Sequence, residues 1–178
     1  MWPASGEESV VRTIILDDTT AGKRTAQPWR IEKDAKIGVG VWMWLTDGSC
    51  SDDGRVGGEA VCSDRNQWRS RRSSLGTGRM EVFNAELWAI GLALGETIEM
   101  RETLQRHGVK TVALFSDAQT AVRRAAHQGP GPGQRLARRI NRRARALFAQ
   151  GIAPEIHWVP GHSAIPRNDE ADSQANLG

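Results

Sequence analysis

The sequence predicts an α/β fold in which helices pack on a mixed five-stranded sheet. From residue 37 onward, the apolar and turn patterns give the order strand, strand, strand, helix, strand, helix, helix, strand, helix. Short turns separate the first three strands, which favours an antiparallel arrangement. The later strands follow helices, as parallel strands require, so we expect the sheet to be antiparallel in its first part and parallel in its second.

The three early strands are expected at residues 37–46, 54–62 and 67–74. The first is rich in Val and Trp, which predicts burial on both faces, and it is expected to end before the turn signal Asp47-Gly48-Ser49. The second carries glycines, which are typical of close backbone approach. The third contains several arginines and is the weakest of the three patterns.

The second half of the chain alternates helices with short apolar strands. Apolar residues at near-helical spacing predict one long helix over 81–107, ended by Gly108. The other expected elements are a strand at 109–115, helices at 120–128 and 134–150, a strand at 155–159 and a final helix at 166–177. Residues 129–133, GPGPG, must form a loop. The buried stripe of the 134–150 helix is expected to be Leu136, Ile140, Ala144 and Leu147.

The domain organisation expected from these patterns is one domain at 37–178 preceded by a polar extension at 1–36. The chain has 178 residues, enough for one ordinary domain and an extension. In the extension, only residues 10–16 have the composition of a short strand. Hydrophobic residues make up 39% and charged residues 25%, which is typical of a globular protein rather than a disordered one.

Composition also indicates in which cellular compartment the protein is expected. No apolar run approaches the ~20 residues of a membrane span, and the N-terminus has no signal-peptide pattern. Cys50 and Cys62 fit a reducing compartment and, without a His/Cys cluster, predict no structural zinc site. We therefore expect an intracellular protein without a membrane partner, with the choice between nucleus and cytoplasm left open.

Positive charge is unevenly distributed along the chain. The net charge is only +3, but residues 65–79 and 135–150 are rich in arginine and contain no acid. Basic faces beside an acidic cluster suit a polyanion held next to bound metal. The alternative is that these arginines form solvated faces without a partner.

Four acids fall where metal chemistry would need them. Asp47 and Asp117 directly follow apolar strands, Glu86 lies in the first turns of the long helix, and Asp172 lies in the final helix. An acid at the end of a buried strand is costly unless something compensates its charge, and strand ends are where sites form in α/β sheets. Two Mg²⁺ ions, which prefer oxygen ligands, would neutralise the four carboxylates. Two ions about 4 Å apart can activate a water and stabilise the leaving oxygen when a phosphodiester is cut.

Each of these positions has an ordinary explanation when it is considered alone. Asp47 before Gly is typical of a turn, Asp117 could be the N-cap of the next helix, and Glu86 could face solvent. Asp172 could form a surface pair with Arg167, and His162 could be an ordinary loop histidine. The joint order of the residues, rather than any one of them, favours a site.

That order resembles the ribonuclease H family over residues 37–178. The matching segments are TDGS (46–49), AELWAIGLAL (85–94), SDAQTA (116–121) and HWVPGHSAIPRNDEAD (157–172). TDGS is common, whereas WVPGH followed ten residues after its histidine by Asp172 is highly specific. The patterns FNAEL and GHSxIPxNxxAD are most similar to the ribonuclease H domain of non-LTR retrotransposon reverse transcriptases.

The resemblance implies an endonuclease that cuts the RNA strand of an RNA/DNA hybrid with two Mg²⁺ ions, with Mn²⁺ able to substitute. It implies that Asp47, Glu86, Asp117 and Asp172 hold the metals and that His162 assists proton transfer or product release. It also implies that Ser49, Gln119 and Asn168 contact the hybrid. Arg138 and Arg142, which lie off the buried stripe of their helix, are expected to contact phosphates. A monomer is expected, either acting alone or derived from a reverse transcriptase polyprotein.

Two departures from the family pattern leave alternatives open. GPGPG stands where many cellular members have a separate basic helix, and the chain ends six residues after Asp172. One alternative is therefore a catalytically impaired, retroelement-derived domain that binds nucleic acid without cutting it. Another is a nuclease or transposase of the same superfold that acts on DNA, although the WVPGH segment does not suit it.

Overall fold

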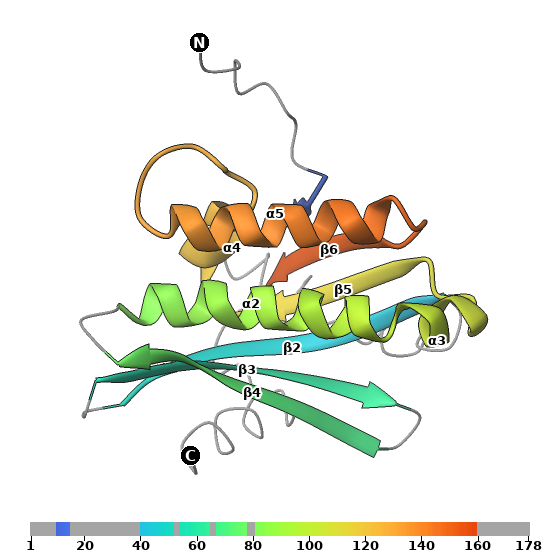
Figure 1. Ribbon diagram of the computed structural model, residues 1–178, viewed down its shortest axis with the longest axis horizontal. Helices are drawn as coiled ribbons and strands as arrows, with labels where there is room; N and C mark the ends of the chain where they lie inside the picture. Colours follow the sequence, from blue (N-terminus) through green and yellow to red (C-terminus); the bar gives the residue numbers. More distant parts are fainter. Residues whose placement is uncertain (1–9, 15–39, 52–53, 65–66, 78–80, 160–178) are drawn as a thin grey trace.

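The computed structural model describes residues 10–14, 40–51, 54–64, 67–77 and 81–159 (Figure 1). Its strands are β1 (Arg12–Ile14), β2 (Val41–Cys50), β3 (Arg55–Asp64), β4 (Gln67–Thr77), β5 (Thr111–Ser116) and β6 (Ala153–Trp158). Its helices are α2 (Val82–Glu99), α3 (Arg101–Arg106), α4 (Gln119–Ala125) and α5 (Gln134–Phe148). Helices α2 and α5 run side by side over one face of the sheet (Figure 1).

The sheet has the strand order β1-β6-β5-β2-β3-β4. Strands β2, β3 and β4 are antiparallel, whereas β2, β5, β6 and β1 are parallel, which confirms the expected mixed sheet. The expected count of five strands is wrong, because β1 adds a sixth at the edge beside β6. Val11, next to β1, is buried, so part of the expected polar extension joins the sheet and its core.

Strand β2 continues four residues beyond the end that the sequence pattern indicates, to Cys50 instead of Thr46. Asp47, Gly48 and Ser49 were expected in a turn, but they continue the ladder with β3 through register partners Glu59, Gly58 and Gly57. An Asp-Gly pair favours a turn only locally. Here the antiparallel partner strand supplies backbone hydrogen bonds that keep the segment extended.

The long helix expected over 81–107 is interrupted. Helix α2 ends at Glu99 and α3 begins at Arg101, with Met100 between them acting as the C-cap of one and the N-cap of the other. Met100 has φ −89° and ψ −1°, which departs from α-helical backbone, although its N–H still donates to Glu96 O. Gly108, with φ +72°, follows the end of α3.

The main core lies between the sheet and the helices. Along β2, Trp42 and Trp44 belong to this core, whereas Met43 and Leu45 belong to a smaller apolar cluster on the opposite face. This alternation is the period of two that a strand imposes. The fully buried Trp44 indole donates a 2.8 Å hydrogen bond to Thr97 Oγ1, which fixes α2 against the sheet.

Helix α5 buries a slightly different stripe from the expected one. Its buried residues are Ala137, Ile140, Asn141, Ala144 and Leu147, and Leu136 is only half-buried. Asn141 tolerates burial because its amide donates to Ala125 O at 2.7 Å and to Ala137 O at 3.0 Å. The helix expected at 166–177 lies outside the described residues. Among the described helices, none is long and apolar enough to cross a membrane.

Candidate metal centre

Three of the four predicted carboxylates meet in space. Asp47, Glu86 and Asp117 each offer a ligand oxygen, and these atoms lie within 4.8 Å of one another. Glu86 is only 6% exposed, so its reading as a solvent-facing helix residue is wrong. Asp47 and Asp117 are half-buried, which leaves the cluster reachable from outside.

Parallel pairing of β2 with β5 brings the two aspartates together. Leu45 and Phe115 are register partners, and each aspartate lies two residues further along its strand direction. Thr46 Oγ1 donates a 3.0 Å hydrogen bond to Phe115 O in the buried interior, which ties the strands just before the acids. Because the carboxyl ends of parallel strands meet at one edge, Asp47 and Asp117 lie there together.

Gly48 brings Glu86 to the same edge. A Cβ at position 48 would collide with the backbone of Ala85 and Glu86, so only glycine lets the first turns of α2 approach β2 this closely. Ala85 and Leu87, on either side of Glu86, are fully buried and hold the turn in place. The glycine of the Asp47-Gly48 pair therefore serves the close contact rather than a turn.

The backbone of Asp117 is fixed by neighbouring chain segments. Trp158 Nε1 donates a 2.9 Å hydrogen bond to Asp117 O, and Val159 N donates to Ser116 O at 3.0 Å. The N-cap of α4 is Ala118, without a side-chain cap hydrogen bond, so the reading of Asp117 as a helix cap is wrong. Sequence reasoning missed the part played by Trp158, although it lies in the segment that carries the most specific motif.

The other predicted site residues fall into three groups. Ser49 and Gln119 are half-buried on the elements that carry or follow Asp47 and Asp117. Arg138 and Arg142 are exposed on α5, as expected, but α5 lies on the helix-covered side of the sheet, away from the side to which Asp47 points. The remaining predicted residues, His162, Asn168 and Asp172, lie outside the described residues.

The electrostatics of the cluster suit a divalent cation. Three carboxylates within 4.8 Å repel one another when ionised, and the repulsion is stronger because Glu86 is buried. All three offer oxygen atoms, which is the donor type that Mg²⁺ and Mn²⁺ prefer. The residues present therefore fit a hard divalent cation.

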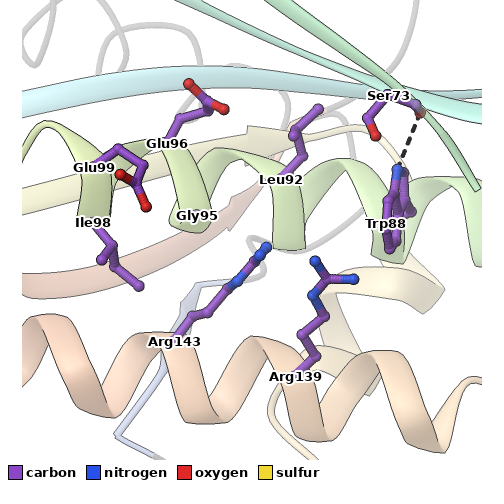
Figure 2. Close-up of a pocket in the computed structure, with 9 residues that line it drawn as sticks. All are labelled: Ser73, Trp88, Leu92, Gly95, Glu96, Ile98, Glu99, Arg139 and Arg143. Carbon is purple, nitrogen blue, oxygen red and sulfur yellow. Dashed lines mark hydrogen bonds between the residues drawn. The ribbon is translucent and has the colours of Figure 1, made fainter.

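A separate hollow of about 250 Å³ lies between α2 and α5 (Figure 2). Arg139 lies with its guanidinium 4.5 Å from the centre of the Trp88 ring, and Arg143 donates to Gly91 O. Burial, followed by the nearby Arg139 and Arg142 charges, lowers the pKa of Arg143. The lining residues are Ser73, Trp88, Leu92, Gly95, Glu96, Ile98, Glu99, Arg139 and Arg143, none of which belongs to the acidic cluster.

This hollow explains why two arginines of the basic helix are half-buried rather than fully solvated. A Cβ at Gly95 would lie 2.8 Å from Arg143 Nη1, so the missing side chain makes room for the guanidinium. Arg139 and Arg143 thus help pack α5 against α2, while Arg135, Arg138 and Arg142 remain exposed. The sequence signal was the glycine pair Gly91 and Gly95, one helical turn apart.

Comparison with solved structures shows the same fold in proteins of low sequence identity. RNase H1 from the halophilic archaeon Halobacterium salinarum is 20% identical with a TM-score of 0.52, covering 75% of this chain and 93% of its own. LC11-RNase H1 from compost is 18% identical with a TM-score of 0.57, covering 78% and 99%. The N-terminal RNase H domain of a Mycobacterium tuberculosis protein, solved as a fusion with maltose-binding protein, is 18% identical with a TM-score of 0.52, covering 75% and 94%.

Comparison at the level of sequence gives the family directly. No curated protein sequence matches the chain. The sequence profile of the RNase H family, in contrast, matches residues 40–178, most of the chain and the whole segment that carries Asp47, Glu86 and Asp117. The chain therefore belongs to the RNase H family.

Proposed function

We propose that this chain is a metal-dependent endonuclease that hydrolyses the RNA strand of RNA/DNA hybrids. The observation that carries the proposal is the convergence of Asp47, Glu86 and Asp117 within 4.8 Å in a chain of the RNase H family. A purely structural role would not explain the convergence, because three neighbouring carboxylates destabilise the metal-free fold.

The metal ligands in this proposal are Asp47, Glu86 and Asp117, joined by Asp172. Two Mg²⁺ ions held there would activate the attacking water and stabilise the leaving oxygen. The protein's own contribution is rigidity, since Gly48 and Trp158 hold the backbone of Glu86 and Asp117 in place. Mn²⁺ offers similar ligand preferences and would substitute.

The reaction breaks one P–O bond of the RNA strand. A water oxygen attacks the phosphorus, the bond to the 3′-oxygen breaks, and the products carry a 5′-phosphate and a 3′-hydroxyl. One proton leaves the water and one joins the 3′-oxygen, and His162 is the group we assign to help this transfer or the release of product.

Substrate recognition is assigned to polar residues near the cluster. Ser49 lies on β2 two residues after Asp47, and Gln119 begins α4 two residues after Asp117. Asn168, which follows the WVPGH segment in the sequence, is assigned the same role. Contacts with 2′-hydroxyls would distinguish RNA from DNA, while phosphate contacts would supply affinity without sequence preference. Arg138 and Arg142 are assigned as phosphate contacts on a separate, exposed face of α5.

The wider assignments are proposed from the family membership together with the sequence patterns. We propose residues 37–178 as the nuclease domain, with residues 1–36 as an extension that contributes β1 to its sheet. Derivation from a retrotransposon reverse transcriptase would account for the FNAEL and GHSxIPxNxxAD patterns. We also propose that the chain is a monomer.

A substrate panel tests the proposed function. Matched RNA/DNA hybrid, duplex RNA and duplex DNA, each labelled on one strand, are incubated with the chain in Mg²⁺ or Mn²⁺. We expect cleavage of the RNA strand of the hybrid alone. Binding of the hybrid without cleavage in either metal would instead support an impaired, nucleic-acid-binding domain, and cleavage of duplex DNA would contradict the substrate assignment.

A further inference from the structure

The strand register places three charged residues in one row across the sheet. Asp47 on β2 pairs with Glu59 on β3, and Glu59 pairs with Arg72 on β4. Directly paired residues point to the same side of a sheet, and neighbouring strands lie about 4.8 Å apart. The row therefore runs from the acidic cluster toward the outer strand, with the Arg72 backbone roughly 10 Å from that of Asp47.

Strand alternation separates the arginines of β4 onto two sides of the sheet. Arg71 Nε lies 2.9 Å from Glu96 Oε2 on α2, so Arg71 faces the helix side. Arg72 Nε lies 3.2 Å from Glu59 Oε1, so Arg72 faces the side to which Asp47 points. Among the arginines that the structure describes on β4, only part of the charge thus lies on the side to which Asp47 points.

Glu59 is buried, where an ionised carboxylate is energetically unfavourable. Its side chain is 2% exposed, and neither carboxylate oxygen has a hydrogen bond of regular geometry among the described residues, which leaves the ion pair with Arg72. A buried ion pair is rarely more stable than an apolar pair of similar size. A nearby negative charge also adds to the repulsion around Asp47.

An apolar residue at position 59 would cost less. Two residues along β3 on the same face, Val61 packs in the cluster formed with Met43, Leu45 and Phe115. An aliphatic side chain at position 59 would extend that cluster without any charge to compensate. The fold thus gains little from Glu59, which favours a role in binding.

We propose that Arg72 contacts a phosphate of the hybrid bound at the metal centre, and that Glu59 is a positioning residue that orients the guanidinium. The Nε contact with Glu59 fixes the plane of the guanidinium, while the Arg72 side chain is still 38% exposed. A fixed, planar guanidinium matches the geometry of a phosphate. This inference rests on the proposed function, since the phosphate belongs to its substrate.

The test compares Arg72→Ala and Glu59→Gln with the matched control Arg71→Ala. Arg71→Ala removes the same charge from the adjacent residue, but on the helix side. Each variant is assayed for kcat and KM on labelled hybrid over a range of salt, and for hybrid binding by fluorescence anisotropy in EDTA. Arg72→Lys tests whether a point charge can replace the planar fork.

We expect Arg72→Ala to raise KM and Kd roughly tenfold, the size of a lost hydrogen bond to a charged group, with little change in kcat. Its log Kd against log salt should be shallower by about one unit, the loss of one phosphate contact. Glu59→Gln should also raise KM, but its salt slope should equal that of the wild type. Arg72→Lys should keep the wild-type salt slope and recover only part of the affinity that Arg72→Ala loses.

Equal KM and salt slope for Arg72→Ala and Arg71→Ala would overturn the inference, as would a Glu59→Gln effect confined to unfolding temperature. A wild-type chain that binds hybrid but cuts it in neither metal would overturn the proposed nuclease, while the anisotropy comparison would still decide the role of Arg72. A wild-type chain that does not bind hybrid would overturn both.

Discussion

Trp158 Nε1 donates a 2.9 Å hydrogen bond to the backbone carbonyl of Asp117. Trp158 closes β6 and Asp117 directly follows β5, so the bond joins two parallel neighbours at the edge where the carboxylates meet. The tryptophan of the WVPGH segment therefore supports the proposed metal ligand Asp117, 41 positions earlier in the chain.

Trp158→Phe should lower activity beyond its effect on stability. The change removes the donor from a partly buried carbonyl, which costs about 0.5–1.5 kcal/mol of unfolding free energy, and it loosens the backbone of Asp117. We expect kcat to fall roughly tenfold and the Mg²⁺ concentration for half-maximal rate to rise. Trp88→Phe is the control, because Trp88 Nε1 also donates to a carbonyl, Ser73 O at 3.1 Å, on the helix side. Equal activities for the two variants would show that the Trp158 bond is only structural.

Gly48→Ala should separate Glu86 from Asp47. The added methyl would meet the backbone of Ala85 and Glu86, and relieving that overlap costs about 1–3 kcal/mol of unfolding free energy. A shift of this kind in a catalytic group can lower the rate about 100-fold. Gly129→Ala is the control, since a Cβ there meets nothing within 4 Å. Normal kcat in a folded Gly48→Ala protein would contradict the close-approach argument.

Arg138→Ala combined with Arg142→Ala tests whether the exposed face of α5 binds the hybrid. If both residues meet phosphates, the slope of log affinity against log salt should become shallower by roughly one to two units. Unfolding temperature should barely change, because exposed arginines contribute little to stability. Arg101→Ala with Arg106→Ala on α3, at the far end of α2 from Glu86, is the charge-matched control (Figure 1). An unchanged slope would leave α5 as a solvated face.

Much of the fold could be predicted because its signals are local. Apolar strands followed by acids marked Asp47 and Asp117, and short turns against helical connections separated the antiparallel from the parallel strands. β1 could be predicted only as a short strand within residues 10–16, because three residues are too few to show a period and they gain their partner only from β6. The break between α2 and α3 at Met100 could not be predicted, because no Gly or Pro stands at or beside this position.

The parts of the site that sequence reasoning missed depend on contacts between distant segments. Asp47-Gly48 resembles a turn until β3 and α2 are placed against it. Glu59 resembles an ordinary strand residue until the register sets it between Asp47 and Arg72. Such relations depend on register, and a strand pattern alone does not fix register without its partner.

Asp47→Asn and Asp117→Asn should each abolish cleavage while leaving the metal-free fold intact or slightly more stable. Removing one charge from a cluster within 4.8 Å relieves repulsion when no cation is bound. The measurement is the unfolding temperature in EDTA beside the cleavage rate in Mg²⁺. A metal-free unfolding temperature many degrees below that of wild type would show that these acids are structural instead.

Metal-dependent cleavage of a hybrid labelled at the RNA 5′ end tests the central claim most directly. The wild-type chain is assayed in Mg²⁺, in EDTA and in EDTA followed by excess Mg²⁺, and product ends are identified by mass. We predict internal cuts in the RNA strand, with 3′-hydroxyl and 5′-phosphate ends, that stop on chelation and return with the metal. Cleavage that survives complete chelation, or an RNA strand left intact when excess Mg²⁺ is present, would contradict the account.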